Sequence, residues 1–171
     1  MGEKKRLGVG VISLGWMGRL HTRSYKAVAE YFPELGVEVE LVAAADPIDS
    51  VREEATGKLG FKRAYADYHE LLADPEVDIV SIASPNFLHK EIALAAIAAG
   101  KPFWIEKPMG VSAEQSREIA QAAEKAGLVS AVGFNYRHTP AIEYMRTLVR
   151  EGKLGRLTNV RVWFIADYNS S

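Results

Sequence analysis

Short apolar runs alternate with longer segments of helical periodicity along most of the chain. The clearest runs are rich in β-branched residues and end at glycine or polar residues, which is typical of strands buried on both faces. Predicted strands span residues 7–13, 37–45, 64–65, 79–83, 103–105 and 129–132. Helical spacing of apolar residues covers 17–31, 51–59, 67–72, 87–99 and 112–126. This alternation predicts parallel strands with helices on both faces, and therefore an α/β fold with a doubly wound sheet.

The rhythm changes after Gly133. A polar stretch at 135–138 precedes a helical pattern that starts at Pro140, and residues 157–166 alternate as an antiparallel strand does. We therefore expect a first domain over 1–133 and the start of a second over 134–171. A lone strand has no partner for its ladder hydrogen bonds, so we expect this second domain to be truncated.

Composition excludes several functional classes. The chain has 171 residues, 21 Lys and Arg against 22 Asp and Glu, a formal charge of -1, 48% hydrophobic residues and no cysteine. A near-neutral balance provides no basic field for nucleic acid or an anionic membrane, so we expect a small-molecule partner. The absence of cysteine excludes a disulfide scaffold, thiolate zinc ligation and a cysteine nucleophile. We expect a cytoplasmic protein without signal peptide, membrane span or metal site.

The turn after the first strand carries a pattern typical of dinucleotide binding. It resembles G-x-G-x-x-G with serine in the first glycine position, and consists of Ser13, Leu14, Gly15, Trp16, Met17 and Gly18. Gly15 lets the backbone approach a pyrophosphate, Gly18 lets the helix pack closely on the strand, and the helix N-terminus presents free N–H groups to the anion. The alternative is a purely structural turn, and Ser13 favours it slightly because a β-carbon restricts the backbone there.

The end of the second strand supplies a candidate partner for the cofactor's ribose. Asp46 lies 28 positions after Gly18, where a carboxylate can accept from the adenosine ribose hydroxyls and repel the 2′-phosphate of NADP. No basic residue follows until Arg52, so the sequence favours NAD over NADP. Three basic residues of the first helix either reach phosphate or form a solvated face: Arg19, His21 and Arg23.

Another candidate site follows the strand at 103–105. Glu106, Lys107 and Pro108 lie just past its carboxyl end, where open α/β sheets place their ligands. A lysine that is partly desolvated beside a nicotinamide can exchange a proton with a substrate hydroxyl. Taken alone, Lys107 is more readily explained as an ordinary residue of a surface loop.

A set of motifs, taken in order over residues 7–165, resembles the glucose-fructose oxidoreductase, inositol dehydrogenase and MocA family. The set comprises Gly15-Trp16-Met17-Gly18, Asp46-Pro47, Ser84-Pro85-Asn86 with His89, Gly100-Lys101-Pro102, Glu106-Lys107-Pro108 and Asn135-Tyr136-Arg137. The resemblance implies a Rossmann domain, a second α/β domain with an open antiparallel sheet, and a complete chain of roughly twice this length that forms homo-oligomers. Lys107 matches the family's active-site lysine. The family's catalytic Asp and His, four residues apart, would lie beyond Ser171.

The resemblance also implies roles for the remaining motif residues. Cofactor contacts are expected from Ser13, Gly15, Trp16, Met17, Gly18, Asp46, Ser84, Pro85, Asn86, His89, Glu106 and Asn135, and substrate contacts from Lys107 and Arg137. A structural role is an equal alternative for His89, and interdomain packing is one for Asn135 and Arg137. Glu106 is expected to position either the nicotinamide ribose or Lys107.

The implied activity is that of an NAD(P)-dependent oxidoreductase acting on a sugar, an anhydrosugar or a polyol such as inositol. The alternative is a nucleotide-binding regulatory module that keeps the fold without dehydrogenase activity. A third reading is that these 171 residues bind the cofactor without turnover.

Overall fold

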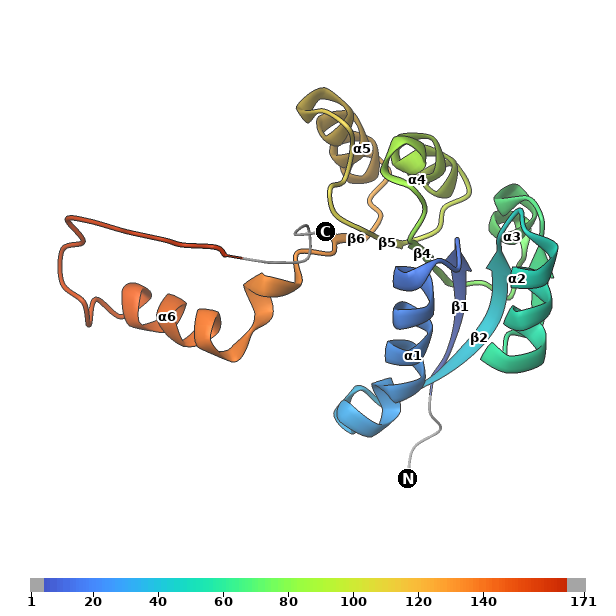
Figure 1. Cartoon of the computed structure of the whole chain (residues 1–171), viewed down its shortest axis with the longest axis horizontal. Helices are drawn as coiled ribbons and strands as arrows, with labels where there is room; N and C mark the ends of the chain where they lie inside the picture. Colours follow the sequence, from blue (N-terminus) through green and yellow to red (C-terminus); the bar gives the residue numbers. More distant parts are fainter. Residues whose placement is uncertain (1–4, 166–171) are drawn as a thin grey trace. The chain divides into compact units, whose positions relative to one another are not determined.

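A six-stranded parallel sheet forms the core of residues 5–133 in the computed structural model, which describes residues 5–165 (Figure 1). The strand order is β3-β2-β1-β4-β5-β6, and every neighbouring pair runs parallel. The strands are β1 Lys5–Ile12, β2 Val37–Ala45, β3 Arg63–Tyr65, β4 Ile79–Ile82, β5 Phe103–Ile105 and β6 Ser130–Val132. The predicted doubly wound α/β sheet is confirmed.

The connections between the strands are the predicted helices, with ends that differ by a few residues. They are α1 Trp16–Tyr31, α2 Asp49–Glu54, α3 Tyr68–Ala73, α4 His89–Ala98 and α5 Ala113–Lys125. Helix α2 continues as a π-helical turn over Ala55–Leu59, and 3-10 turns cover Pro33–Leu35 and Asn86–Leu88. None of the helices within residues 5–165 is long and apolar enough to cross a membrane.

Two apolar clusters hold the helices against the two faces of the sheet. On one face, Val9, Val11 and Leu14 pack with residues of α1 and α2, including Tyr25 and Val51. On the other face, residues of β2, β4 and β5 pack against α3, α4 and α5; this cluster includes Val42, Val80, Ile105, Leu71, Ile92 and Ile119. Burial on both faces explains why the strands are continuous apolar runs.

Strand β1 occupies the point where the sheet's order reverses. It pairs with β2 on one side and β4 on the other. The chain leaves β1 toward β2 and leaves β4 toward β5, so the connections diverge at the carboxyl ends of these two adjacent strands. Open α/β sheets bind ligands in the crevice that this divergence creates.

The chain divides into two compact units, Met1–Gly133 and Phe134–Ser171. In the second unit, a 3-10 turn at Asn135–His138 precedes α6, Pro140–Arg150, which starts at the predicted proline. Residues 157–165 form no strand and are exposed, because nothing within them supplies a partner ladder; Ala166, the last residue of the expected strand, lies outside the described residues.

Two glycines of β1 lie where the strand has no room for side chains. A Cβ on Gly8 would lie 1.9 Å from the Glu76 carbonyl oxygen, and one on Gly10 would lie 2.7 Å from Leu71 Cδ2. The loop before β4 and helix α3 therefore pack directly on the β1 backbone.

We predict that Gly8→Ala lowers the free energy of unfolding by about 1–3 kcal/mol or more, because backbone must move to admit the methyl group. Gly57→Ala is the matched control: a Cβ there meets nothing within 4 Å. It should leave stability unchanged or raise it by up to ~1 kcal/mol. Denaturant unfolding measures both, and equal midpoints for the two variants would contradict the packing described.

Candidate cofactor and active site

The loop from β1 to α1 keeps the shape of a glycine turn although it begins with serine. Ser13 has φ of +70°, and it is the only non-glycine residue with positive φ in the described part of the chain. This conformation costs an L-residue about 1–2 kcal/mol. Its N–H donates to the Ala45 carbonyl oxygen at 2.8 Å, which ties the turn to the end of β2. Serine thus adopts the positive φ that favours glycine at this position of the motif.

The two remaining glycines of the loop have different environments. A Cβ on Gly18 would lie 2.0 Å from the Ser13 carbonyl oxygen, so only glycine allows α1 to approach β1 this closely. A Cβ on Gly15 would meet nothing within 4 Å. Gly15 is the N-cap of α1 and provides no side-chain cap, so the first N–H groups of the helix face open space. This is the arrangement that binds pyrophosphate in dinucleotide sites.

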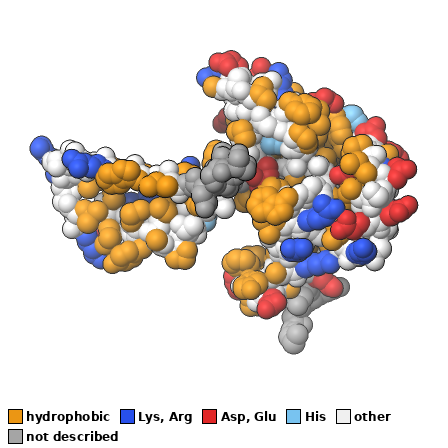
Figure 2. All heavy atoms as spheres, in the orientation of Figure 1, with side chains coloured by type: hydrophobic (Ala, Val, Ile, Leu, Met, Phe, Trp, Pro, Cys, Tyr) orange, Lys and Arg blue, Asp and Glu red, His pale blue; other side chains and the backbone are white. Residues whose placement is uncertain are grey.

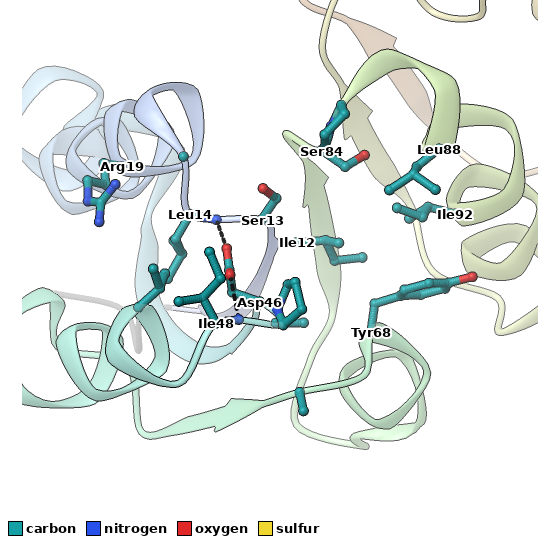
Figure 3. Close-up of a pocket in the computed structure, with 16 residues that line it drawn as sticks. Ile12, Ser13, Leu14, Arg19, Asp46, Ile48, Tyr68, Ser84, Leu88 and Ile92 are labelled. Carbon is teal, nitrogen blue, oxygen red and sulfur yellow. Dashed lines mark hydrogen bonds between the residues drawn. The ribbon is translucent and has the colours of Figure 1, made fainter.

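Asp46 joins this loop to the segment after β2. Its Oδ2 accepts from the Leu14 N–H at 3.0 Å and its Oδ1 from the Ile48 N–H at 3.1 Å, as the dashed lines in Figure 3 show. The residue is buried, at 7% exposure. A carboxylate has about four acceptor positions, so two backbone bonds leave capacity for ribose hydroxyls. The sequence did not predict that Asp46 also fixes the loop.

A cavity of about 480 Å³ opens beside Asp46 at the carboxyl ends of β1, β2 and β4. Of the predicted cofactor residues, five line it: Ser13, Gly15, Asp46, Ser84 and Pro85. The far wall is apolar and includes Leu88, Ile92 and Tyr68, which lie opposite the phosphate loop in Figure 3. A mainly apolar pocket with few polar groups is typical of cofactor sites. These wall residues were not predicted, because their apolar pattern is indistinguishable from that of core positions.

Tyr68 remains a neutral phenol in this wall. Burial raises its pKa, and so does the hydrogen bond from its hydroxyl to Glu91 Oε1 at 2.6 Å. Its ring therefore contributes an uncharged aromatic surface to the cavity.

Basic side chains around the cavity are already paired. Arg19 lies 2.6 Å from Glu54, and this hydrogen bond raises the pKa of Arg19 and lowers that of Glu54. Arg52 donates to the Asp46 carbonyl oxygen at 2.8 Å and pairs with Asp49. Figure 2 shows the same mixture of acidic and basic side chains on one face of the first unit. Both guanidinium groups therefore already have acidic partners.

His21 turns inward instead of facing solvent or phosphate. Its Nε2 lies 3.0 Å from Glu106 Oε1, and its Nδ1 lies 2.6 Å from Ser81 Oγ. The partly buried Tyr25 lies beside the same serine. Burial raises the pKa of Tyr25, and its hydrogen bond with Ser81 partly offsets this. Glu106 Oε2 accepts from the Lys107 N–H at 3.3 Å. The sequence did not predict the contact between His21 and Glu106. A sequence signal for it exists, because His21 lies one turn after Gly18, the residue at which α1 packs on the sheet.

Lys107 lies at the carboxyl end of β5 with an exposed side chain, and the peptide bond between it and Pro108 is cis. The Pro108 carbonyl oxygen accepts from Asn86 Nδ2 at 2.7 Å and lies 2.9 Å from His89 Nδ1. His89 Nε2 lies 2.9 Å from the Ser84 carbonyl oxygen, and the residue is 1% exposed. His89 therefore lies behind the cavity wall, out of direct reach of a ligand.

The other predicted residues are not among those that line this cavity. Trp16 and Met17 lie on the first turn of α1, and Trp16 is 79% exposed. Asn135 and Arg137 belong to the second unit, where Arg137 lines an open groove along α6 with Ile142 and Met145. No cluster of three metal-ligating side chains is present among residues 5–165.

Comparisons with known proteins agree with this geometry. A family model described as an oxidoreductase family with an NAD-binding Rossmann fold matches residues 7–134. The chain is 36% identical over 169 residues to levoglucosan dehydrogenase of Pseudarthrobacter phenanthrenivorans, covering 97% of this chain and 43% of that protein. It is 29% identical over 154 residues to myo-inositol 2-dehydrogenase of Thermotoga maritima, covering 90% and 44%.

Solved structures show the same likeness. An NAD-binding oxidoreductase from Klebsiella pneumoniae superposes with a TM-score of 0.83 and 43% identity, covering 88% of this chain and 40% of that one. Levoglucosan dehydrogenase in complex with NADH and levoglucosan gives 0.84 and 35%, covering 89% and 41%. The chain thus spans less than half the length of these relatives.

The open helix N-terminus, the buried Asp46 beside the cavity and the match over residues 7–134 agree with the expected cofactor, NAD. The chain belongs to the glucose-fructose oxidoreductase, inositol dehydrogenase and MocA family of NAD-binding oxidoreductases.

Proposed function

We propose that this chain supplies the NAD-binding part and the proton-transfer lysine of a dehydrogenase for a sugar, an anhydrosugar or a polyol. The observation that carries the proposal is the position of Lys107. Its side chain is exposed at the sheet edge that also holds the cofactor cavity, while the backbone on both sides of it is held by buried groups. The names of the relatives, levoglucosan dehydrogenase and myo-inositol 2-dehydrogenase, support a polyhydroxylated substrate.

Different residues of the first unit bind different parts of the cofactor. The free N–H groups at the start of α1 hold the pyrophosphate, and the remaining acceptor positions of Asp46 hold the adenosine ribose hydroxyls. Tyr68 and Ile92 belong to the apolar wall that faces the bound cofactor. When bound, the nicotinamide accepts the hydride that leaves the substrate's carbinol carbon.

Lys107 handles the proton that accompanies this hydride. As the C–H bond breaks, the uncharged amine accepts the hydroxyl proton at Nζ, so that the substrate leaves as a carbonyl compound and Lys107 becomes an ammonium ion. In the reverse direction the ammonium returns the proton to the carbonyl oxygen. General acid-base catalysis of this kind contributes about 10²–10⁴-fold to the rate.

We predict that Asp46→Asn weakens NAD binding by roughly 5–30-fold, or about 1–2 kcal/mol, because a charge-assisted acceptor is lost. Asp78→Asn is the matched control: Asp78 Oδ2 also accepts a backbone N–H, that of Gly8 at 2.6 Å, but at the opposite end of the strands. Calorimetric titration of both variants with NAD and NADP measures the effect. If the unmodified chain binds NADP as tightly as NAD, the role given to Asp46 is wrong.

We predict that Lys107→Met in the full-length protein lowers kcat by about 10²–10⁴-fold and changes the Kd of NAD little. Lys125→Met, at the exposed end of α5, is the control for loss of a lysine charge. Absorbance of the reduced nicotinamide, followed over a panel of sugars, anhydrosugars and polyols, gives the rates. Near-normal turnover by Lys107→Met would rule out the proton-transfer role, and binding of NAD without turnover of any substrate would favour a regulatory module.

The boundary between domains is also a proposal. Strand β6 ends at Val132, and the Gly133 N–H still donates to the Ile105 carbonyl oxygen at 2.9 Å. We predict that a chain ending after Gly133 folds and keeps its NAD affinity within about threefold, and self-associates less than the chain of 171 residues, because the exposed apolar residues of 157–165 are gone. Calorimetry and light scattering measure the two properties. Loss of folding or of NAD binding would place the boundary elsewhere.

A further inference from the structure

Both ring nitrogens of the buried His89 face backbone carbonyl oxygens. Nδ1 lies 2.9 Å from the Pro108 oxygen and Nε2 lies 2.9 Å from the Ser84 oxygen. The residue is 1% exposed, so bulk water does not compete for either ring nitrogen.

Carbonyl oxygens accept hydrogen bonds and cannot donate them. A neutral imidazole has a single N–H, so a neutral ring would satisfy one oxygen and turn a lone pair toward the other in a buried site. Such a buried, unpaired contact is unfavourable. A ring with hydrogen on both nitrogens can donate to both oxygens, and each of these hydrogen bonds is charge-assisted.

We propose that His89 is a positioning residue that carries hydrogen on both ring nitrogens and clamps the segment after β4 to the Lys107–Pro108 turn. The catalytic part of this inference rests on the proposed function of Lys107, whereas the clamp itself does not.

The clamp holds the backbone on the C-terminal side of Lys107, and a contact of Glu106 holds it on the N-terminal side. Pro108 directly follows Lys107, and its carbonyl oxygen accepts hydrogen bonds from the side chains of His89 and Asn86. On the preceding side, Glu106 accepts the Lys107 N–H and is itself held by His21. The backbone of Lys107 is thus restrained at both ends, and its exposed side chain keeps its freedom.

The same clamp reaches the cofactor cavity. Ser84, whose oxygen His89 bonds, lines that cavity. His89 therefore sets the distance between the cavity wall and the turn that carries the lysine. A displacement of about 1 Å in a reacting group costs on the order of 10²-fold in rate, so this distance has a measurable catalytic consequence.

Nuclear magnetic resonance on the 171-residue chain tests the clamp directly. The chain contains four histidines, so ¹⁵N-histidine labelling gives few signals, and a His→Gln variant of each assigns them. At neutral pH, we expect His89 to show two protonated ring nitrogens with slowly exchanging hydrogens. The exposed His69, whose Nδ1 lies 2.8 Å from Asp67 Oδ1, is the internal reference for an exposed ring. A spectrum in which one His89 nitrogen is unprotonated would overturn the proposal.

Kinetics of the full-length protein test the positioning role. His89→Gln and His89→Asn each retain at most one of the two bonds, and we expect kcat to fall at least tenfold while the Kd of NAD changes less than threefold. His69→Gln, with the same chemical change at an exposed site, should leave kcat unchanged. An unaltered kcat, or an equal loss of kcat and NAD affinity, would contradict positioning of Lys107. If Lys107→Met keeps its turnover while His89 is doubly protonated, the proposed function fails and the clamp stands.

Discussion

The contact between Gly18 and the Ser13 carbonyl oxygen is the constraint on which the site depends. A Cβ at position 18 would lie 2.0 Å from that oxygen, so α1 lies against the end of β1 only because the residue is glycine. This contact sets the helix N-terminus at the mouth of the cavity. One turn further along α1, it also brings His21 to Glu106 at 3.0 Å. A single packing contact therefore positions both the phosphate loop and the residue that precedes the lysine.

The site consists of two parts that buried polar groups join. Asp46 ties the phosphate loop to the segment after β2, and His89 ties the cavity wall at Ser84 to the lysine turn. Unpaired buried polar groups are costly, so these contacts favour one arrangement of the loops over others. Preorganisation of this kind lowers the ordering cost of cofactor binding and keeps the lysine backbone in place. The chain spans less than half the length of these relatives.

Periodicity predicted all six strands of the first unit, because buried parallel strands need continuous apolar runs and their helices need apolar positions every three to four residues. It did not predict that Ser13 adopts a positive φ or that His21 points inward, since both depend on how α1 packs on the sheet. The motif located Asp46 but not its two backbone bonds, which arise only when loops distant in sequence meet. The strand expected at 157–166 is absent over its described part, since pairing requires a partner that alternation alone does not supply.

The most direct test of this account compares amide and histidine-ring resonances of the unmodified chain with those of Gly18→Ala, using Gly57→Ala as the control. If the packing of α1 positions both parts of the site, Gly18→Ala should weaken NAD binding by at least tenfold. Without any ligand, it should also shift the Lys107 amide, which is connected to α1 through Glu106 and His21. Unchanged Lys107 and His21 resonances in a folded Gly18→Ala chain would show that the two parts are independent and would contradict the account.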